Sequence, residues 1–151
     1  MTIAERIERD YIDTYKAKDQ QRLDTLRLLK TAVKNRQVAL RRSLEPLDDA
    51  TMLDIIDQQA KQRQDSIEQF TAAGRPDLAA KEAAELAILK GYLPEPLSPE
   101  ALNQAVSAAI EITGARDMKG MGAVMQAVMN AHKGQVDGKQ LSALVRARLT
   151  S

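Results

Sequence analysis

The sequence has no cysteine and no tryptophan, and only one phenylalanine and one histidine among its 151 residues. Without cysteine there can be no disulfide framework, no thiolate metal site and no cysteine nucleophile. A single histidine, His132, excludes zinc motifs that need two histidines and the paired histidines of di-iron helix bundles. These absences remove several classes of enzyme.

No stretch of the chain approaches the roughly 20 apolar residues that a membrane-spanning helix requires. The first residues, Met1 to Arg6, also lack the apolar core of a secretory signal. We therefore expect no association with a membrane, and the reducing cytoplasm is the predicted location because the chain carries no cysteine.

Aliphatic residues supply most of the apolar content, because 44% of the chain is hydrophobic and only 3% is aromatic. Leu, Ile, Val, Met and Ala are the residues that pack helices against helices. A chain of this length with this apolar content can bury a core. The composition predicts an all-α fold.

Capping residues and apolar periodicity predict seven helices. A capping box at Thr2 and Glu5 opens the first helix, and Pro46 ends the second. The predicted helices begin near residues 2, 19, 48, 76, 99, 117 and 137. The second extends to Leu44 and the third to Gly74, so these two are long enough to form a long αα-hairpin with each other.

Three of the five prolines lie between Tyr92 and Pro99, where a helix cannot continue. This segment is the best candidate for a domain boundary. The sequence predicts an N-terminal lobe of about four helices at residues 1–93, a linker at 94–97 and a small three-helix C-terminal module at 98–151.

Basic residues are concentrated on the second predicted helix, although the net charge of the chain is only +1. Four of them, Arg27, Lys30, Lys34 and Arg41, fall within about 60° of arc at 100° per residue. Such a stripe could follow a phosphate backbone. Equally, acidic residues of a neighbouring helix could pair with it, or it could be an ordinary solvated face.

A second basic region follows Gly114, where six basic residues outnumber two acidic ones, Asp117 and Asp137. The six are Arg116, Lys119, Lys133, Lys139, Arg146 and Arg148. The helix that begins near residue 117 could also place free N–H groups close to the first two of them, an arrangement suited to a phosphate. Because aromatic residues are few, a nucleic-acid partner would be folded RNA recognised by shape and phosphates.

Motifs for catalysis and cofactor binding are missing from the sequence. No serine has a histidine beside it, and Gly114–Gly122 lacks the G-K-[ST] element of a phosphate loop. We interpret Glu82 and Glu85 as a solvated helical face, and Gly122 as a position where a neighbouring helix packs closely. The sequence predicts no catalytic residue, no metal ligand and no cofactor.

Short motifs in a fixed order along nearly the whole chain give a family resemblance. They are Arg27–Lys30, Lys61–Ser66, Gly74-Arg75 with Asp77-Leu78, Glu82 with Glu85-Leu86, Tyr92–Pro94, Met118–Gly122 with Val124-Met125, and Asp137–Lys139. In this order and spacing the chain resembles the YqeY family. The resemblance implies a C-terminal module similar to the tail domain of the B subunit of the tRNA-dependent amidotransferase, a carbon–nitrogen ligase with glutamine as amido-N-donor, whose tail contacts tRNA.

The resemblance therefore implies an association with amidotransferases without an active site, because the catalytic machinery of those enzymes has no counterpart in this sequence. The resulting hypothesis is a non-catalytic accessory protein that binds tRNA or other folded RNA. The RNA would contact the six basic residues of the C-terminal module, assisted by the stripe on the second helix. An amidotransferase or another protein is the possible protein partner. The alternative hypothesis is a helical adaptor for protein–protein interaction with no RNA role.

Overall fold

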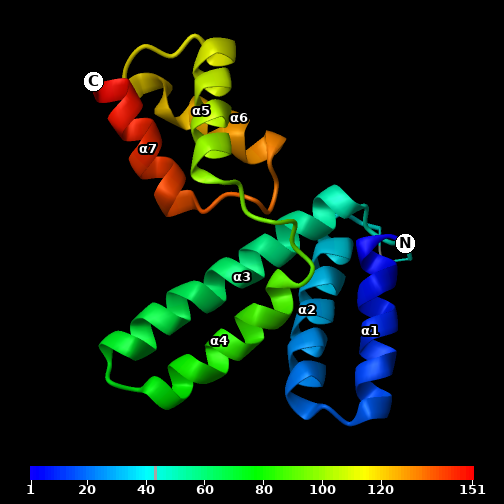
Figure 1. Cartoon of the computed structure of the whole chain (residues 1–151). Helices are drawn as coiled ribbons and strands as arrows, with labels where there is room; N and C mark the ends of the chain where they lie inside the picture. The colour runs from blue at the N-terminus through cyan, green and yellow to red at the C-terminus, as the bar shows by residue number, and fades with distance from the viewer. Residues whose placement is uncertain (43) are drawn as a thin grey trace. The chain divides into compact units, whose positions relative to one another are not determined.

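The computed structural model describes residues 1–42 and 44–151, and the regular structure in these residues is entirely helical (Figure 1). The α-helices are α1 (Ile3–Ala17), α2 (Gln20–Ala39), α3 (Asp49–Ala72), α4 (Pro76–Lys90), α5 (Pro99–Thr113), α6 (Met121–Ala131) and α7 (Gly138–Thr150). A short 3₁₀ helix, η1 (Met118–Gly120), precedes α6. The all-α prediction is confirmed.

Local capping signals explain where most of these helices begin. The Thr2 side chain accepts a hydrogen bond from Glu5 N while the Glu5 carboxylate accepts one from Thr2 N, which completes the capping box. The Asp48 side chain caps α3 by accepting a hydrogen bond from Thr51 N, and Ser98 caps α5 with Pro99 in the first helical position. Each of these starts is specified by residues within one turn of it.

The second helix is shorter than predicted, because α2 ends at Ala39 and not near Leu44. Arg42 N donates to Gln37 O at 2.8 Å and Arg41 N to Val38 O at 3.0 Å, which closes the helix in a Schellman-type turn. Arg41 adopts the left-handed conformation with φ of 57°. It therefore does not lie on the same helical face as Arg27, Lys30 and Lys34.

Helix pairing in the N-terminal region also differs from the prediction. In Figure 1, α3 runs antiparallel to α4, and α1 runs antiparallel to α2. The predicted hairpin between the second and third helices is therefore wrong: the long hairpin is formed by α3 and α4. The apolar stripe of α3 did predict an antiparallel partner, but it carried no information that distinguished α2 from α4.

The chain divides into two compact units, Met1–Leu93 and Pro94–Ser151, each with its own buried core. In the first unit the most completely buried side chains are Leu26, Leu29, Met52, Ile56 and Leu89. In the second they are Val106, Val124, Val128, Leu141 and Val145. Aliphatic side chains make up most of both cores, as the composition predicts, and Tyr92 also belongs to the first.

Residues 94–97, which the sequence predicts as a linker, are hydrogen-bonded to the second unit. Leu97 N donates to Gln135 O at 2.9 Å, and the Gln135 side chain donates to Glu95 O at 3.0 Å. These bonds fasten the segment to the connection between α6 and α7. Since Leu97 directly precedes the Ser98 cap, they also fix the start of α5.

Tyr92 ties the end of α4 to α1 within the first unit. The side chain is 4% exposed, and its hydroxyl donates a 2.6 Å hydrogen bond to Asp10 Oδ2. The Arg6 guanidinium lies 5.2 Å from the centre of the Tyr92 ring and donates to Gly91 O at 3.2 Å. Tyr92 and the Gly91 carbonyl are therefore anchored to α1, more than 80 residues away in sequence.

This contact predicts a specific loss of stability at high pH. Burial raises the pKa of Tyr92 well above its ordinary value of 10.0, and the carboxylate of Asp10 adds to the shift. Below pH 10 Tyr92 is protonated in the folded and in the unfolded protein. Above pH 10 it ionises in the unfolded protein while it is still protonated in the folded one, so unfolding becomes more favourable. The stabilisation is thus complete below pH 10 and lost above it.

Tyr92→Phe should cost about 1–2 kcal/mol at pH 8, because a hydrogen bond to a charged acceptor is removed. Above pH 10 the wild type should lose up to about 1.4 kcal/mol per pH unit more than the variant, so the difference between them narrows. Urea unfolding at several pH values measures both free energies. Parallel pH profiles for the two proteins would contradict this role of Tyr92.

Candidate nucleic-acid interface

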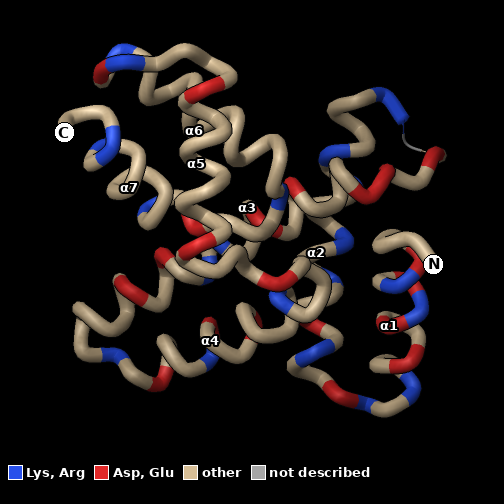
Figure 2. Tube along the Cα trace, turned by 45° about the horizontal axis from the view of Figure 1, so that its top comes forward, with Lys and Arg blue, Asp and Glu red and all other residues tan. Residues whose placement is uncertain are grey.

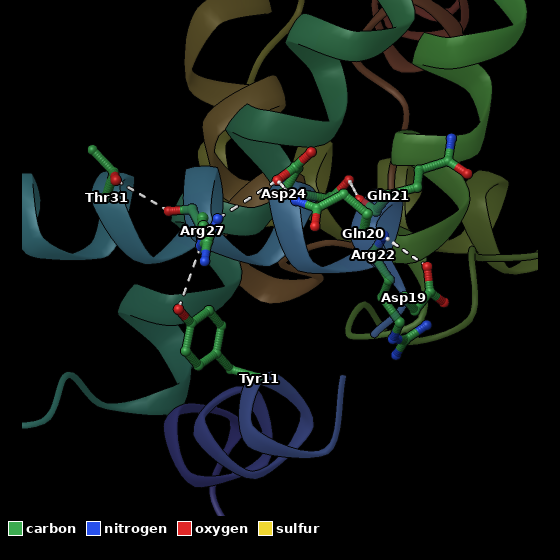
Figure 3. A network of polar contacts seen from close by, with 9 residues as sticks. Tyr11, Asp19, Gln20, Gln21, Arg22, Asp24, Arg27 and Thr31 are labelled. Carbon is green, nitrogen blue, oxygen red and sulfur yellow. Dashed lines mark hydrogen bonds and ion pairs between the residues drawn. The ribbon is translucent and has the colours of Figure 1, made fainter. Parts of the chain in front are cut away.

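Two members of the basic stripe of α2, Arg27 and Lys30, are held by contacts within the first unit. Arg27 Nε lies 3.4 Å from the hydroxyl of Tyr11 and its Nη1 lies 3.8 Å from Asp24 (Figure 3). Lys30 Nζ lies 2.9 Å from Glu8 of α1 and 4.1 Å from the centre of the Tyr11 ring. The interpretation that a neighbouring helix pairs with the stripe therefore holds for Lys30, and Arg27 is held by Tyr11 and by its own helix.

The other two members of the predicted stripe are separated from this network. Lys34 makes no ion pair with any residue that the structure describes. Arg41 lies beyond the end of α2 in the left-handed turn. The four side chains do not form a continuous track for a phosphate backbone.

The basic residues of the second unit fall into three places. Arg116 and Lys119 lie in the connection between α5 and α6, Lys133 lies in the connection between α6 and α7, and the remaining three are on α7. Figure 2 shows blue segments both in the loop that precedes α6 and along α7. In Figure 1 the C-terminal end of α7 approaches that same loop, and α7 contacts η1.

The three basic residues of α7 do not share one face. Lys139 and Arg146 are seven positions apart and so lie on the same side of the helix, whereas Arg148 is turned by about 160° from Arg146. The Arg148 guanidinium donates a 2.7 Å hydrogen bond to Ser107 Oγ of α5. Arg148 therefore connects two helices of the unit, and the six predicted residues are not one surface.

The loop before α6 presents its cations on a locally ordered backbone. Gly114 ends α5 with φ of 70°, and the Asp117 carboxylate accepts a 3.0 Å hydrogen bond from Lys119 N. Arg116 and Lys119 are both exposed. Neither of them, nor Arg146, forms an ion pair within residues 1–42 and 44–151. These three cations are the most available for an external anion.

The close approach predicted for Gly122 occurs instead at Gly120. A Cβ on Gly120 would lie 2.5 Å from the Cβ of Ala115 and 3.1 Å from its Cα, so only glycine allows the loop to fold back on itself. A Cβ on Gly122 would meet no atom within 4 Å. The interpretation of Gly122 as a packing glycine is therefore wrong, and the glycine that shapes the cationic loop is Gly120.

Glu82 and Glu85 do not form the solvated face that the sequence suggested. The Arg63 Nε atom of α3 lies 2.9 Å from Glu85 Oε2 and 3.6 Å from Glu82 Oε2. The three side chains are only 14%, 11% and 21% exposed for Arg63, Glu85 and Glu82 respectively. The two carboxylates are therefore the ion-pair partners of a nearly buried arginine that joins α3 to α4. Arg63 Nε and Glu82 Oε2 are buried and form no hydrogen bond of good geometry, so the attraction between the charges holds the three side chains together.

The described residues contain neither a cluster suited to a metal ion nor a helix suited to crossing a membrane. Across residues 1–42 and 44–151, no group of three or more His, Asp or Glu side chains is placed to hold a metal ion. None of the helices in this part of the chain combines the length and the apolarity needed to span a bilayer. The lone histidine, His132, lies at the C-terminal cap of α6 and is half-buried.

The curated proteins to which this chain is similar include several named "Altered inheritance of mitochondria protein 41, mitochondrial". The protein from Saccharomyces cerevisiae is 36% identical over 85 residues, which cover 56% of this chain and 45% of that protein. The protein from Pyrenophora tritici-repentis is 30% identical over 142 residues, which cover 91% of this chain and 75% of that protein. The chain thus matches a little under half the length of the yeast protein.

These names contradict the cytoplasmic location that was predicted from the sequence, because both relatives are named as mitochondrial. The prediction was wrong for a physical reason. A lack of cysteine means that no disulfide can form, but it does not distinguish the cytoplasm from any other compartment. Composition carried no signal on that choice.

The comparison with protein families tests the resemblance directly. The model of the Yqey-like protein family matches residues 4–149, which is nearly the whole chain and includes both compact units. The ordered motifs from Arg27 to Lys139 all fall inside this range. The chain therefore belongs to the YqeY family.

Proposed function

We propose that this chain is a non-catalytic accessory protein that binds tRNA or other folded RNA through its C-terminal unit. The observation that carries the proposal is the group of exposed cations on that unit, Arg116, Lys119 and Arg146, which have no anionic partner in the described chain. Unpaired surface cations on a rigid scaffold attract phosphates and release their counterions. A tRNA-dependent amidotransferase is the enzyme that such a protein would assist.

The distribution of charge in the C-terminal unit supports this function. Asp117 and Asp137 both use their carboxylates to cap a helix, through hydrogen bonds to Lys119 N at 3.0 Å and Lys139 N at 3.1 Å. They thereby order the backbone that presents neighbouring cations. Residues 94–151 contain no Phe, Tyr or Trp for stacking on bases, and their one aromatic ring, that of His132, is half-buried at the end of α6. Contacts with phosphates and the shape of a folded RNA are therefore the interactions that this unit could offer.

Equilibrium binding of labelled tRNA to the full chain tests the proposal. If about three phosphates are neutralised, affinity should fall about twenty- to fortyfold between about 50 and 200 mM salt. The double variant Lys119→Glu/Arg146→Glu should weaken binding about tenfold or more and flatten the salt dependence, because it removes two phosphate contacts and adds two repulsive charges.

A matched control reverses two exposed lysines of the first unit, Lys61→Glu/Lys81→Glu, which changes the net charge by the same amount. It should retain binding within about threefold of the wild type, since its effect is long-range and screened. Binding without salt dependence, or a Lys119→Glu/Arg146→Glu variant that binds as tightly as the wild type, would overturn the proposed function.

A further inference from the structure

The most exposed large apolar side chains of the second unit lie at its cationic loop. Among residues 94–151, all of which the structure describes, these are Ile112 and Met118, at 81% and 40% exposure. Ile112 belongs to the last turn of α5, and Met118 lies in sequence between Arg116 and Lys119. The core of the unit includes neither of the two, so both are available for contact with a ligand.

The loop is closed on itself, which keeps its exposed side chains together. A Cβ on Gly120 would lie 2.5 Å from the Cβ of Ala115, so the two ends of the loop touch. Within it, Gly120 N donates to Asp117 O at 3.0 Å, and Lys119 N donates to the Asp117 carboxylate at 3.0 Å. The side chains of residues 116–119 are therefore presented by one short, ordered segment.

Charge around this segment is mixed and not uniformly positive. Two carboxylates, Glu111 and Asp117, accompany Arg116 and Lys119, and all four residues are exposed. None of the four forms an ion pair with any residue that the structure describes. A track for the backbone of a double helix is unfavourable here, because each carboxylate repels the nearest phosphate. The loop is better suited to a few phosphates beside an apolar surface.

We propose that this loop binds an unpaired nucleotide of the folded RNA. The base would lie against Ile112 and Met118, and its neighbouring phosphates would lie at Arg116 and Lys119. The inference rests on the proposed function and narrows the class of RNA that the C-terminal unit takes.

The chemistry of paired and unpaired bases is the reason for this choice. In a double helix the faces of the bases are covered by stacking, and side chains reach only polar edges, sugars and phosphates. An unpaired base exposes an apolar face, and aliphatic side chains such as Ile and Met can pack against such faces. A fully paired RNA would satisfy the two cations but leave Ile112 and Met118 without an apolar contact.

Two RNA probes with the same number of phosphates test the inference on the full chain. One is a blunt duplex, and the other is a duplex that carries a bulge of unpaired nucleotides; both are titrated at the same salt concentration. The bulged probe should bind about five- to tenfold more tightly, because apolar contact with a base adds to the contacts with phosphates. Equal affinities would overturn the inference and leave RNA binding intact, whereas binding of neither probe and no binding of tRNA would overturn the proposed function as well.

A double variant assigns the preference to the two apolar side chains. Ile112→Ser/Met118→Ser should bind the bulged probe no more tightly than the blunt one, and its affinity for the blunt duplex should stay within about twofold of the wild type. The matched control, Ile12→Ser/Leu28→Ser, changes two residues of the first unit that are 48% and 50% exposed, and it should keep the preference. A preference that survives Ile112→Ser/Met118→Ser, or that the control loses to the same extent, would overturn the proposal.

Discussion

Arg63→Met should lower the free energy of unfolding by about 3 kcal/mol, the largest effect that we expect from a single change of charge. The substitution keeps the apolar stem but removes the guanidinium that lies 2.9 Å from Glu85 and 3.6 Å from Glu82. Two nearly buried carboxylates would then face each other without a cation between them. Breaking one side of a buried ion pair costs far more than the pair itself contributes, because the remaining charge stays desolvated.

Arg75→Met is the matched control for this prediction, since it removes another arginine from the same hairpin. The Arg75 and Asp77 side chains form their ion pair at 3.1 Å but are 56% and 63% exposed, so solvent screens the pair. Its loss should leave the free energy of unfolding nearly unchanged, because exposed ion pairs contribute little to stability. Urea unfolding of both variants measures the difference, and an Arg63→Met variant as stable as Arg75→Met would contradict the role assigned to the buried cluster.

Gly120→Ala should destabilise the C-terminal unit by about 2 kcal/mol, because a methyl group there would overlap the Cβ of Ala115 at 2.5 Å. The obstacle is a methyl group and the Cα behind it, at 3.1 Å, neither of which can rotate away. The loop must therefore move as a whole, and with it Arg116 and Lys119. The unfolding temperature of the second unit and the affinity of the chain for tRNA should both decrease.

Gly122→Ala, two residues further on, should have no such effect. The added methyl group meets no atom within 4 Å, and alanine is preferred to glycine in a helix by up to about 1 kcal/mol. The variant should unfold at the same temperature as the wild type or at a higher one. Equal destabilisation by the two glycine substitutions would show that the close approach at Gly120 does not hold the loop.

The helix starts could be predicted because the determinants are local. Thr2, Asp48 and Ser98 each accept a hydrogen bond from a backbone N–H three residues on, and such a contact depends only on nearby sequence. The end of α2 could not be predicted in this way. Leu44 continues the apolar periodicity of the helix, yet the chain turns earlier, at Arg41. Such left-handed turns usually contain glycine, and the sequence has none at this position to indicate the end of the helix.

Contacts between helices that are distant in sequence could not be predicted, because they do not depend on the nearby sequence. Glu82 and Glu85 are spaced to share a helical face, and Arg63 was visible in the sequence, but nothing local indicates that α4 and not α2 lies along α3. The same holds for Glu8, whose pairing with Lys30 removes a cation from the predicted stripe. Tertiary pairing decided which charges remained available.

The sequence alone could have divided the basic residues of α7 between two faces of the helix. The spacing of Lys139, Arg146 and Arg148 already places the last of them on the opposite face of a helix. Its hydrogen bond to Ser107 is the tertiary consequence of that position. What spacing could not give is the Gly120–Ala115 approach, which folds the loop around Arg116 and Lys119.

The most direct test of the account is to map where folded RNA contacts the full chain. Ultraviolet crosslinking to tRNA followed by mass spectrometry identifies the attached peptides. We expect crosslinks at residues 114–120 and on α7. We expect none at Arg27 or Lys30, because these two side chains are already paired within the first unit. Crosslinks confined to residues 1–93, or a complete absence of them under conditions that crosslink a known tRNA-binding protein, would contradict an RNA-binding C-terminal unit.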